Sequence, residues 1–594
     1  MIKTTCAIAL TTLLCSSLPA QSDQDQRGLK ILPVGDLLRG SSSPRPPRLT
    51  DLSNRADRQD RNFALLATGG YRVLGPGELT ALILSSMRGD EDEISASVQA
   101  ANLFLEGPEE GLAEAEELAN ALRGAVARRT EIRARLFRIE TDTPYPAIAS
   151  AADLGPLVAD LSAIWEGVTT ALSGQQVSLA LTKLTRYVNE VQTEVAQDSS
   201  IYDPETGTMF EGIEVVVESH SMVAPGDRAL YCQFALAERN RDIQLLSTGV
   251  RNMMSIGVPD LSTTSGSFSG RVQDGGALLV SIQSRLGEGS NLLLVLQVRD
   301  LGRGQAMGPV GKTLLLPVSA ITSKSLRDRP SPEPADEVAY TNGRYPAFSD
   351  GFGLPQMDSK PSIEGGHLVE LISQSLGELA DEGDSYLGEI SNGLAAGYLI
   401  VQGSEALHAG ARRVLGSLED RMVQSVQVQV RSRLPEISPS TSVFSQVGDA
   451  NAGEGPIQKV VTFPTMLDRS SLIFSGTETA VVQDYDVEIA QERSSVNPVV
   501  YTVFKGLSVT VSPALHGEDL GAELDVAVSY FPEPTLQRMG WEEGGDLFHL
   551  QLQRAEFHQD GPAQVGTHAF LGWGPKIQDG GVTRQSYVTV RINR

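Results

Sequence analysis

The chain has few cysteines for its length. Only 3 of its 594 residues are cysteine, and two of them, Cys6 and Cys15, fall within the first 20 residues. Loss of that segment would leave Cys232 alone, so we expect no intramolecular disulfide. Stability must then come from buried apolar area, and a chain of this length can form two or more hydrophobic cores.

Basic residues are also scarce relative to acidic ones. The sequence holds 48 Lys and Arg against 74 Asp and Glu, a formal net charge of -26. Because a phosphate backbone demands a basic face, this balance argues against nucleic acid as a partner. It fits a soluble surface in the periplasm or outside the cell.

Long apolar runs are missing as well, since no stretch of about 20 apolar residues is long enough to cross a bilayer. The first segment has Lys3, an apolar run over 7–14 and small residues leading to Ala20, the order of a secretory signal peptide over 1–20. Leu14 disfavours lipid attachment at Cys15, because a small residue is normally wanted there. We therefore expect export to the periplasm or outer membrane of a Gram-negative-type bacterium, or secretion.

Composition divides the rest of the chain. Residues 21–67 are rich in Ser, Pro, Asp, Arg and Gln without sustained periodicity, which predicts a flexible leader. Residues 301–356 contain a second such stretch and are expected to form a linker that could hold one strand. Two bodies remain, 68–300 and 357–594, each near the upper size of a single domain.

The two bodies resemble each other in sequence. Residues 194–217 align without a gap with 488–511, and ten of the 24 positions are identical. Shorter matches precede this block in the same order in both halves, including 77–87 against 366–376. The pattern predicts a tandem duplication of one module.

Each copy is predicted to begin with a small helix-strand-helix cap, with helices at 78–87 and 111–128 in the first copy and at 367–376 and 404–420 in the second. The period then changes to two, as in Val426, Val428 and Val430, which predicts half-buried strands. Strand-like segments at 212–217 and 506–511 follow. We predict an α+β fold in which each copy is a cap followed by an antiparallel, β-rich domain.

This arrangement resembles the secretin family of type II and type III secretion systems. The second copy carries the Gly-led strand Gly506-Leu-Ser-Val-Thr-Val-Ser-Pro513 and a return strand over 522–528, and the first carries similar segments at 212–217 and 229–236. Asp-Gly pairs, Asp274-Gly275 and Asp560-Gly561, precede an apolar strand near the end of each copy. The resemblance implies a non-catalytic envelope protein that acts in assembly of a secretion or pilus complex or in protein export.

The sequence also departs from that family. Only about 25 residues, many of them Ser, Gly and polar, occupy the place in the second copy where secretins form their gate. The terminal signature of transporting secretins is absent, and with aromatics at 5% no aromatic girdle of an outer-membrane pore is visible. A soluble periplasmic or secreted scaffold or binding protein with a pore-less secretin-type fold is therefore the alternative.

Motifs for chemistry are weak. Residues 306–313 satisfy a loose phosphate-loop pattern, but Pro317 argues against the helix that such a loop needs, so we expect a Gly-rich loop leading into a strand and no nucleotide. His549, His558 and His568 lack the spacing of a zinc site. The acidic run 90–93 lacks the pattern of a calcium loop.

No nucleophile lies in a recognisable catalytic context, and Gly266-Ser-Phe-Ser-Gly270 has Phe where a nucleophile elbow has Ser. We predict no catalytic, cofactor-binding or metal-binding residues, no cofactor, and no enzyme activity, with a carboxylate-based glycan hydrolase as a distant third hypothesis. The expected partners are other copies of the chain or other envelope and secretion proteins. Membrane association is expected only through an oligomer.

Overall fold

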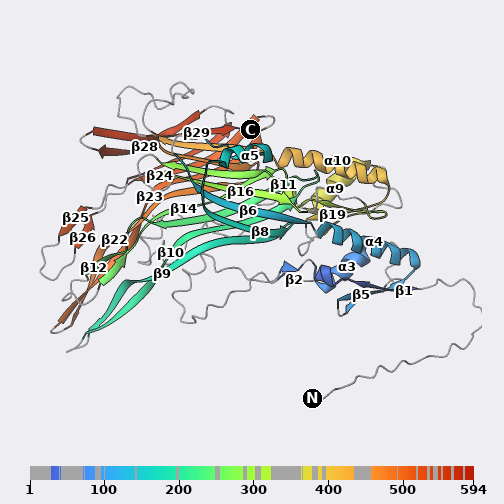
Figure 1. Ribbon diagram of the computed structural model, residues 1–594, viewed down its shortest axis with the longest axis horizontal. Helices are drawn as coiled ribbons and strands as arrows, with labels where there is room; N and C mark the ends of the chain where they lie inside the picture. Colours follow the sequence, from blue (N-terminus) through green and yellow to red (C-terminus); the bar gives the residue numbers. More distant parts are fainter. Residues whose placement is uncertain are drawn as a thin grey trace, which may run out of the picture.

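The computed structural model describes residues 28–38, 40–41, 71–72, 74–86, 95–99, 101–126, 128–140, 144–195, 200–247, 255–284, 291–301, 309–322, 363, 365–377, 386–390, 397–433, 457–490, 493–516, 519–530, 535–538, 546–549, 553–562, 568–579 and 582–593. These residues form a β-rich, antiparallel fold with a small number of helices (Figure 1). The sheets run along the long axis of the molecule, and the helices gather toward one end.

One sheet contains eight antiparallel strands, some of them more than 20 residues long. Its spatial order is β27-β24-β23-β22-β14-β11-β10-β9. The strands are β9 (Gln176–Val195), β10 (Ser200–Ser221), β11 (Arg228–Arg239), β14 (Asp260–Val272), β22 (Ser471–Ala490), β23 (Arg493–His516), β24 (Asp519–Tyr530) and β27 (Gln553–Pro562).

A second sheet contains nine strands, eight of them in the order β28-β29-β20-β21-β15-β16-β6-β8, with β7 paired to β15 beside this path. Its strands are β6 (Arg129–Arg138), β7 (Ile148–Ala149), β8 (Ala163–Leu172), β15 (Ala277–Ser284), β16 (Leu292–Asp300), β20 (Ser425–Arg433), β21 (Ile457–Met466), β28 (His568–Asp579) and β29 (Val582–Asn593).

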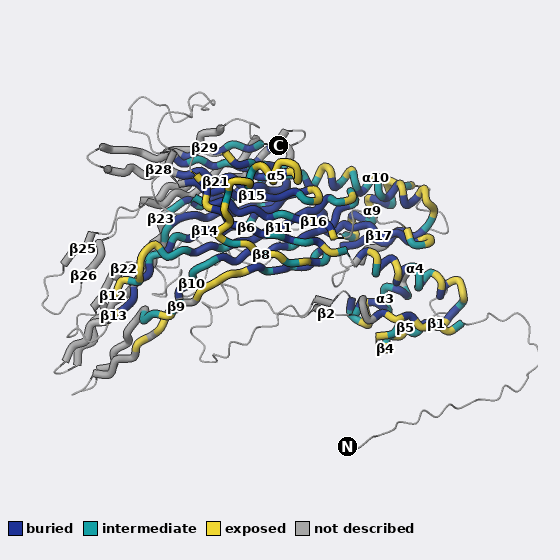
Figure 2. The backbone as a smooth tube through the Cα atoms, viewed as in Figure 1, coloured by how far each residue is buried: buried dark blue, intermediate teal, exposed yellow. Residues whose placement is uncertain are grey.

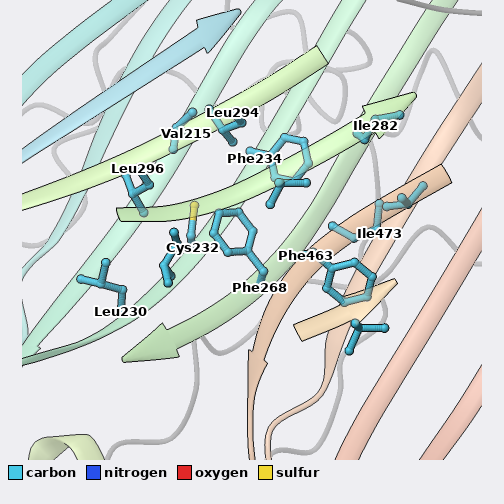
Figure 3. Packing of buried hydrophobic residues seen from close by; sticks show 14 of the residues in the cluster. Val215, Leu230, Cys232, Phe234, Phe268, Ile282, Leu294, Leu296, Phe463 and Ile473 are labelled. Atoms are coloured by element: carbon cyan, nitrogen blue, oxygen red, sulfur yellow. The ribbon is translucent and has the colours of Figure 1, made fainter. Parts of the chain in front are cut away.

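The two sheets pack face to face around one hydrophobic core (Figure 2). Alternating burial along β6 shows why, since every second side chain points into this core. Figure 3 shows Phe234 and Phe268 in the middle of the core, with ring centroids 6.0 Å apart in an edge-to-face arrangement. Phe463 of β21 and Ile473 of β22 join the same cluster from the second half of the chain.

Helix α5 (Ala151–Val158) adds a layer on the outer face of the nine-stranded sheet. Its buried Leu154 packs with Leu279 of β15 and Val295 of β16. Ser150 caps the helix by accepting a hydrogen bond from the backbone N–H of Asp153.

Two small α/β caps lie at the same end of the sheets (Figure 1). In each cap a three-stranded antiparallel sheet carries helices on one face. The first has strand order β1-β5-β4, and the second has the order β17-β19-β18. Their elements are β1 (Gly28–Pro33), α1 (Gly35–Leu38), α3 (Pro76–Ser86), β4 (Ser95–Gln99), β5 (Asn102–Gly107) and α4 (Glu109–Val126), then β17 (Thr313–Pro317), α6 (Ser319–Thr322), α9 (Gly365–Leu376), β18 (Tyr386–Ile390), β19 (Tyr398–Gln402) and α10 (Glu405–Met422).

Three short two-stranded pairs complete the described elements. They are β2 (Gly40–Ser41) with β3 (Tyr71–Arg72), β12 (Gln244–Ser247) with β13 (Ser255–Val258), and β25 (Thr535–Arg538) with β26 (Asp546–His549).

Gly212 shows how closely two strands of the eight-stranded sheet approach. Its backbone has φ of 128°, and a Cβ at this position would lie only 2.0 Å from the carbonyl oxygen of Leu181. Only glycine fits such an approach without displacing the neighbouring backbone. On β23 the residue that corresponds to Gly212 is also a glycine, Gly506, and it lies opposite Gly476 of β22.

The structure confirms the predicted β-rich antiparallel character and the predicted strands at 212–217 and 506–511, which lie within β10 and β23. Helices occur where they were predicted, within two residues at each end. The signal peptide expected over 1–20 lies outside the described residues.

Three expectations need correction. Part of the leader expected to be flexible, 21–67, forms β1 and α1, and β1 pairs along its full length with β5. Each cap contains three strands rather than the single strand of a helix-strand-helix unit. The linker 301–356 was expected to hold one strand, and β17 lies there, but it belongs to the sheet of the second cap. Asp274 and Gly275 form the turn between β14 and β15, whereas Asp560 and Gly561 lie within β27, so the two Asp-Gly pairs are not equivalent.

Candidate assembly interface

Strands from the first and second halves of the chain meet inside both large sheets, and we call these meeting lines the inner junction. In the eight-stranded sheet, β14 pairs with β22 from Asp260 opposite Thr479 to Ser267 opposite Leu472. The pairing is antiparallel and supports one buried side-chain hydrogen bond, 3.2 Å between the hydroxyl oxygens of Thr264 and Ser475.

In the nine-stranded sheet, the inner junction joins β15 to β21 over four residue pairs, from Ser281 opposite Thr462 to Ser284 opposite Lys459. A buried hydrogen bond of 3.0 Å runs from the backbone N–H of Met466 to the hydroxyl of Ser269 and ties the two sheets together near this line. The contact surface is therefore made by main-chain pairing with a few specific side-chain bonds.

Arg271 at the end of β14 holds one end of the inner junction. Its guanidinium bonds to Asp227 at 2.5 and 2.9 Å and to Asp420 of α10 at 2.9 Å, and its backbone N–H donates to the hydroxyl of Ser425 at 2.6 Å. Burial opposes the charge of this guanidinium, but its hydrogen bonds to Asp420 and Asp227 outweigh that effect and raise its pKa. An open hollow of about 380 Å³ lies beside it, lined in part by Gln273.

Glu419 of α10 is a buried carboxyl group at the same end of the sheets. Only 1% of its surface is exposed, and its two oxygens accept hydrogen bonds of 3.1 and 2.9 Å from the backbone N–H of Val223. Burial raises the pKa of this carboxyl to about 8, although the Val223 N–H and the charge of Arg271 act in the opposite direction. The group thus links the second cap to the turn between β10 and β11.

A second buried polar cluster centres on Arg228 of β11. Its guanidinium lies 3.0 Å from Asp300, 3.1 Å from the hydroxyl of Thr130 and 2.7 Å from the hydroxyl of Ser221. Tyr398 of the second cap lies close enough for its hydroxyl to interact with this cluster, and burial raises the pKa of that phenol. Burial likewise lowers the pKa of Arg228, with Asp300 opposing the shift.

The eight-stranded sheet ends at β9 and β27, and the nine-stranded sheet ends at β8 and β28; we call these the outer edges. On the first-half side they expose large apolar side chains, with Ile164 45%, Val168 47% and Leu181 62% exposed. An edge strand carries unpaired main-chain groups and can accept a further strand. Exposed apolar side chains on such an edge favour a protein partner over water.

The residues considered for chemistry from the sequence fall on separate elements, where the structure describes them. Thr313, at the end of the loose phosphate-loop pattern, begins strand β17 rather than a helix, as predicted. His549, His558 and His568 lie on three different strands, β26, β27 and β28. The acidic run 90–93 lies outside the described residues.

Cys232 is fully buried in the core between the sheets. Burial raises its thiol pKa well above the usual range, which removes the thiolate that reactive cysteines need. Within the described part of the chain, no group of three or more His, Cys, Asp and Glu side chains is arranged to hold a metal ion. Among the same residues, no helix is both long and apolar enough to span a membrane.

Sequence reasoning missed the buried polar groups Glu419 and Arg228. A signal for one of them was present, since Leu407, Ala411 and Leu415 recur every four residues on the buried face of α10 and Glu419 takes the next place. A carboxylate in an otherwise apolar stripe marks a buried titratable group. Arg228 has no comparable local signal, because its partner Asp300 lies far along the chain.

No family model matches this chain, and no characterised protein matches it in sequence. Among solved structures, the secretin domain of InvG from the Salmonella SPI-1 injectisome is similar over 39% of this chain and 80% of its own, with 11% identity and a TM-score of 0.20. The type II secretin GspD from enteropathogenic Escherichia coli covers 39% and 84% at 11% identity and a TM-score of 0.18. ExeD of Aeromonas hydrophila covers 96% and 90% at 9% identity and a TM-score of 0.17. TM-scores this low establish neither the fold nor the function of the chain.

Proposed function

We propose that this chain is a non-catalytic, self-assembling protein of the bacterial envelope, built as a tandem duplication of a secretin-like module. In this proposal it acts in the assembly of a secretion or pilus complex or in protein export. The observation that carries the proposal is the repetition of strand order through both large sheets, with one inner junction in each sheet and an edge strand at either end.

The same order of elements recurs in both halves, although β7 and α5 of the first half have no counterpart among the described elements of the second. Along the first half, β1, α1, α3, β4, β5, α4, β6, β8, β9, β10, β11, β14, β15 and β16 follow in the same order as β17, α6, α9, β18, β19, α10, β20, β21, β22, β23, β24, β27, β28 and β29 in the second. The spatial orders agree too, since β14-β11-β10-β9 matches β27-β24-β23-β22 and β15-β16-β6-β8 matches β28-β29-β20-β21.

This correspondence supports a specific mode of self-assembly. In each sheet the inner junction joins an edge strand of the first module to an edge strand of the second, β14 to β22 and β15 to β21. The same step, repeated between chains, pairs β27 of one copy with β9 of the next and β28 with β8. The outer edges would then be covered as the inner junction already is.

The inner register predicts the residues that would lie opposite each other. Leu181 on β9 corresponds to Ser475 on β22, because Thr182 and Gly476 are paired with the matching glycines of β10 and β23. Ser475 lies opposite Thr264 at the inner junction, and the counterpart of Thr264 on β27 is Ala555. The repeated step therefore places Leu181 of one chain opposite Ala555 of another.

Exposure supports this placement. Leu181 is 62% exposed, whereas its counterpart Ser475 is 3% exposed within the inner junction. Val168 on β8 is 47% exposed, and its counterpart Thr462 is 2% exposed. The outer edges thus carry apolar surface at the positions that the chain covers where the two modules meet.

The test uses two differently tagged proteins that each carry one added cysteine, Leu181→Cys or Ala555→Cys, besides the buried Cys232. After mixing and mild oxidation, a disulfide between the two tags is expected, together with particles larger than one chain in light scattering and negative-stain microscopy. Leu371→Cys, at a residue 43% exposed on α9 of the second cap, replaces Leu181→Cys as the matched control. A monomer that forms no more 181–555 product than the control would sink the proposal.

The second candidate function is a soluble periplasmic or secreted scaffold or binding protein that keeps the fold without a pore. The short polar segment at 434–456, which lies outside the described residues, favours it because little chain is available there for a gate. A stable monomer recovered from the soluble periplasmic or secreted fraction would support this candidate over the first.

A further inference from the structure

Inside the chain, the sheet of the second cap packs against a helix of the first. Leu315 of β17 and Ile400 of β19 share a buried cluster with Leu118 and Leu122 of α4. Polar contacts fix the approach, since the carboxylate of Glu117 accepts a 3.0 Å hydrogen bond from the backbone N–H of Lys312.

The C-terminal end of α4 makes a matching contact. The hydroxyl of Tyr398 on β19 donates a 3.3 Å hydrogen bond to the carbonyl oxygen of Ala125. The inner cap contact therefore runs along α4 from Glu117 to Ala125, with an apolar centre and one polar contact at each end.

The first cap presents the same sheet face, but uncovered. Strand pairing aligns Ile31 with Leu315 and Phe104 with Ile400, and the sequences Ile31-Leu-Pro-Val34 and Leu315-Leu-Pro-Val318 differ at one position. Ile31 is 52% exposed, whereas Leu315 is 2% exposed. Leu29, two residues before Ile31 on the same face, is 69% exposed.

The second cap presents the same helix face, also uncovered. In α10 the positions that correspond to Leu118 and Leu122 are Val414 and Leu418, each only partly buried. The positions that correspond to the buried Ala121 and Ala125 are Ser417 and Arg421, both exposed. The first cap therefore exposes the sheet surface of this contact, and the second cap exposes the helix surface.

We propose that the outer face of the β1-β5-β4 sheet of one copy docks on helix α10 of a second copy of this chain. The inference rests on the proposed self-assembly and names a surface for it outside the two large sheets. The direction agrees with the sheets, because in both places the second module of one chain meets the first module of the next.

The charges on the two surfaces also support a second copy of this chain as the docking partner. At the inner contact Glu117 lies beside Lys312, next to the paired residues Thr313 and Gln402. At the proposed contact, Arg413 stands in the place of Glu117, and the exposed Glu106 stands in the place of Gln402. An acidic residue is thus exchanged for a basic one on the helix while the sheet gains an acidic residue, a complementary change.

The test is a cross-link between differently tagged chains carrying Asn102→Cys, the counterpart of Tyr398, and Arg421→Cys, the counterpart of Ala125. A short bis-maleimide reagent is expected to join them. The control is Asn102→Cys mixed with Glu405→Cys, because Glu405 lies 16 residues before Arg421 on α10, about 24 Å along the helix axis. Background is set by the parent protein, in which Cys232 is fully buried.

Two surface variants sharpen the result. Ile31→Asp is expected to reduce the 102–421 product at least tenfold while leaving the 181–555 disulfide in place, and Leu245→Asp is expected to change neither. Arg413→Glu should also weaken the product, and adding Glu106→Arg should restore it. Because both of these residues are exposed, the exchange does not threaten folding.

A 181–555 disulfide without a 102–421 product, or an Ile31→Asp protein that cross-links like Leu245→Asp, would overturn the cap contact and leave the proposed function standing. A monomer that forms neither product would overturn both.

Discussion

Replacement of Glu419 by glutamine should make the protein less sensitive to alkaline pH. The raised pKa of about 8, against an ordinary value of 4.5, means that the folded state holds a proton that the unfolded state releases. Between these two values the free energy of unfolding falls as pH rises, by about 1.4 kcal/mol per unit. The stability linked to this proton is present below pH 4.5 and is lost by pH 8, a total of at most about 5 kcal/mol.

The glutamine side chain of the Glu419→Gln variant would keep an oxygen that accepts from the Val223 N–H but would carry no ionisable group. At pH 5 we expect the variant and the parent to differ by less than about 1 kcal/mol. At pH 8.5 the variant should be more stable by about 2 to 4 kcal/mol. The control Glu370→Gln removes a carboxylate from an exposed position on α9 and should shift stability by less than about 0.5 kcal/mol at either pH.

The assay is denaturant unfolding at the two pH values, together with hydrogen exchange of peptides from α10. Because Glu419 joins this helix to the turn between β10 and β11, protection of α10 should fall first in the parent as pH rises. Equal pH dependence of unfolding in the parent and Glu419→Gln would refute the reasoning.

Other substitutions test the core and the inner junction. Gly212→Ala should destabilise the protein by at least about 2 kcal/mol in denaturant unfolding, since the added Cβ would meet the Leu181 carbonyl at 2.0 Å. Arg271→Ala removes hydrogen bonds to two aspartates and should lower stability by about 1 to 3 kcal/mol, less at high salt, and no salt dependence would count against these ion pairs. Native Cys232 should react with a thiol reagent only after unfolding, and rapid labelling of the folded protein would contradict its burial.

Local sequence patterns predicted several of the strands and helices. Alternation at Val426, Val428 and Val430 predicted a strand, and their complete burial in β20 shows one face turned to the core. The amphipathic spacing within 404–420 predicted α10, which begins after the N-cap Ser404. These elements are set by residues close in sequence, so the sequence alone was enough to locate them.

The pairing of strands that lie far apart in the chain could not be predicted from local sequence patterns. The partner of β14 is β22, about 200 residues later, and neither strand carries a mark that selects the other. Strand β1 was missed because it lies in a polar segment and gains its order from β5 through pairing. The caps as three-stranded sheets therefore became visible only when distant strands were placed together.

The candidate interface was only partly predictable. Association with other copies was expected, but which edge strands could carry it depends on the order of both sheets. The charges at Arg228 and Asp300 lie far apart in sequence and become one buried pair through the packing of β11 and β16.

The buried cluster around Arg228 also makes the contact between the two modules of one chain different from the proposed contact between chains. Strand pairing aligns Arg228 with Leu520 and Thr130 with Val426. Leu520 and Val426 are buried and apolar, so the buried polar cluster has no equivalent in the second module. Tyr398, which interacts with this cluster, corresponds to Asn102 of the first cap. An assembly of this chain would consequently come apart on dilution into whole two-module chains, and any closed ring would hold an even number of modules.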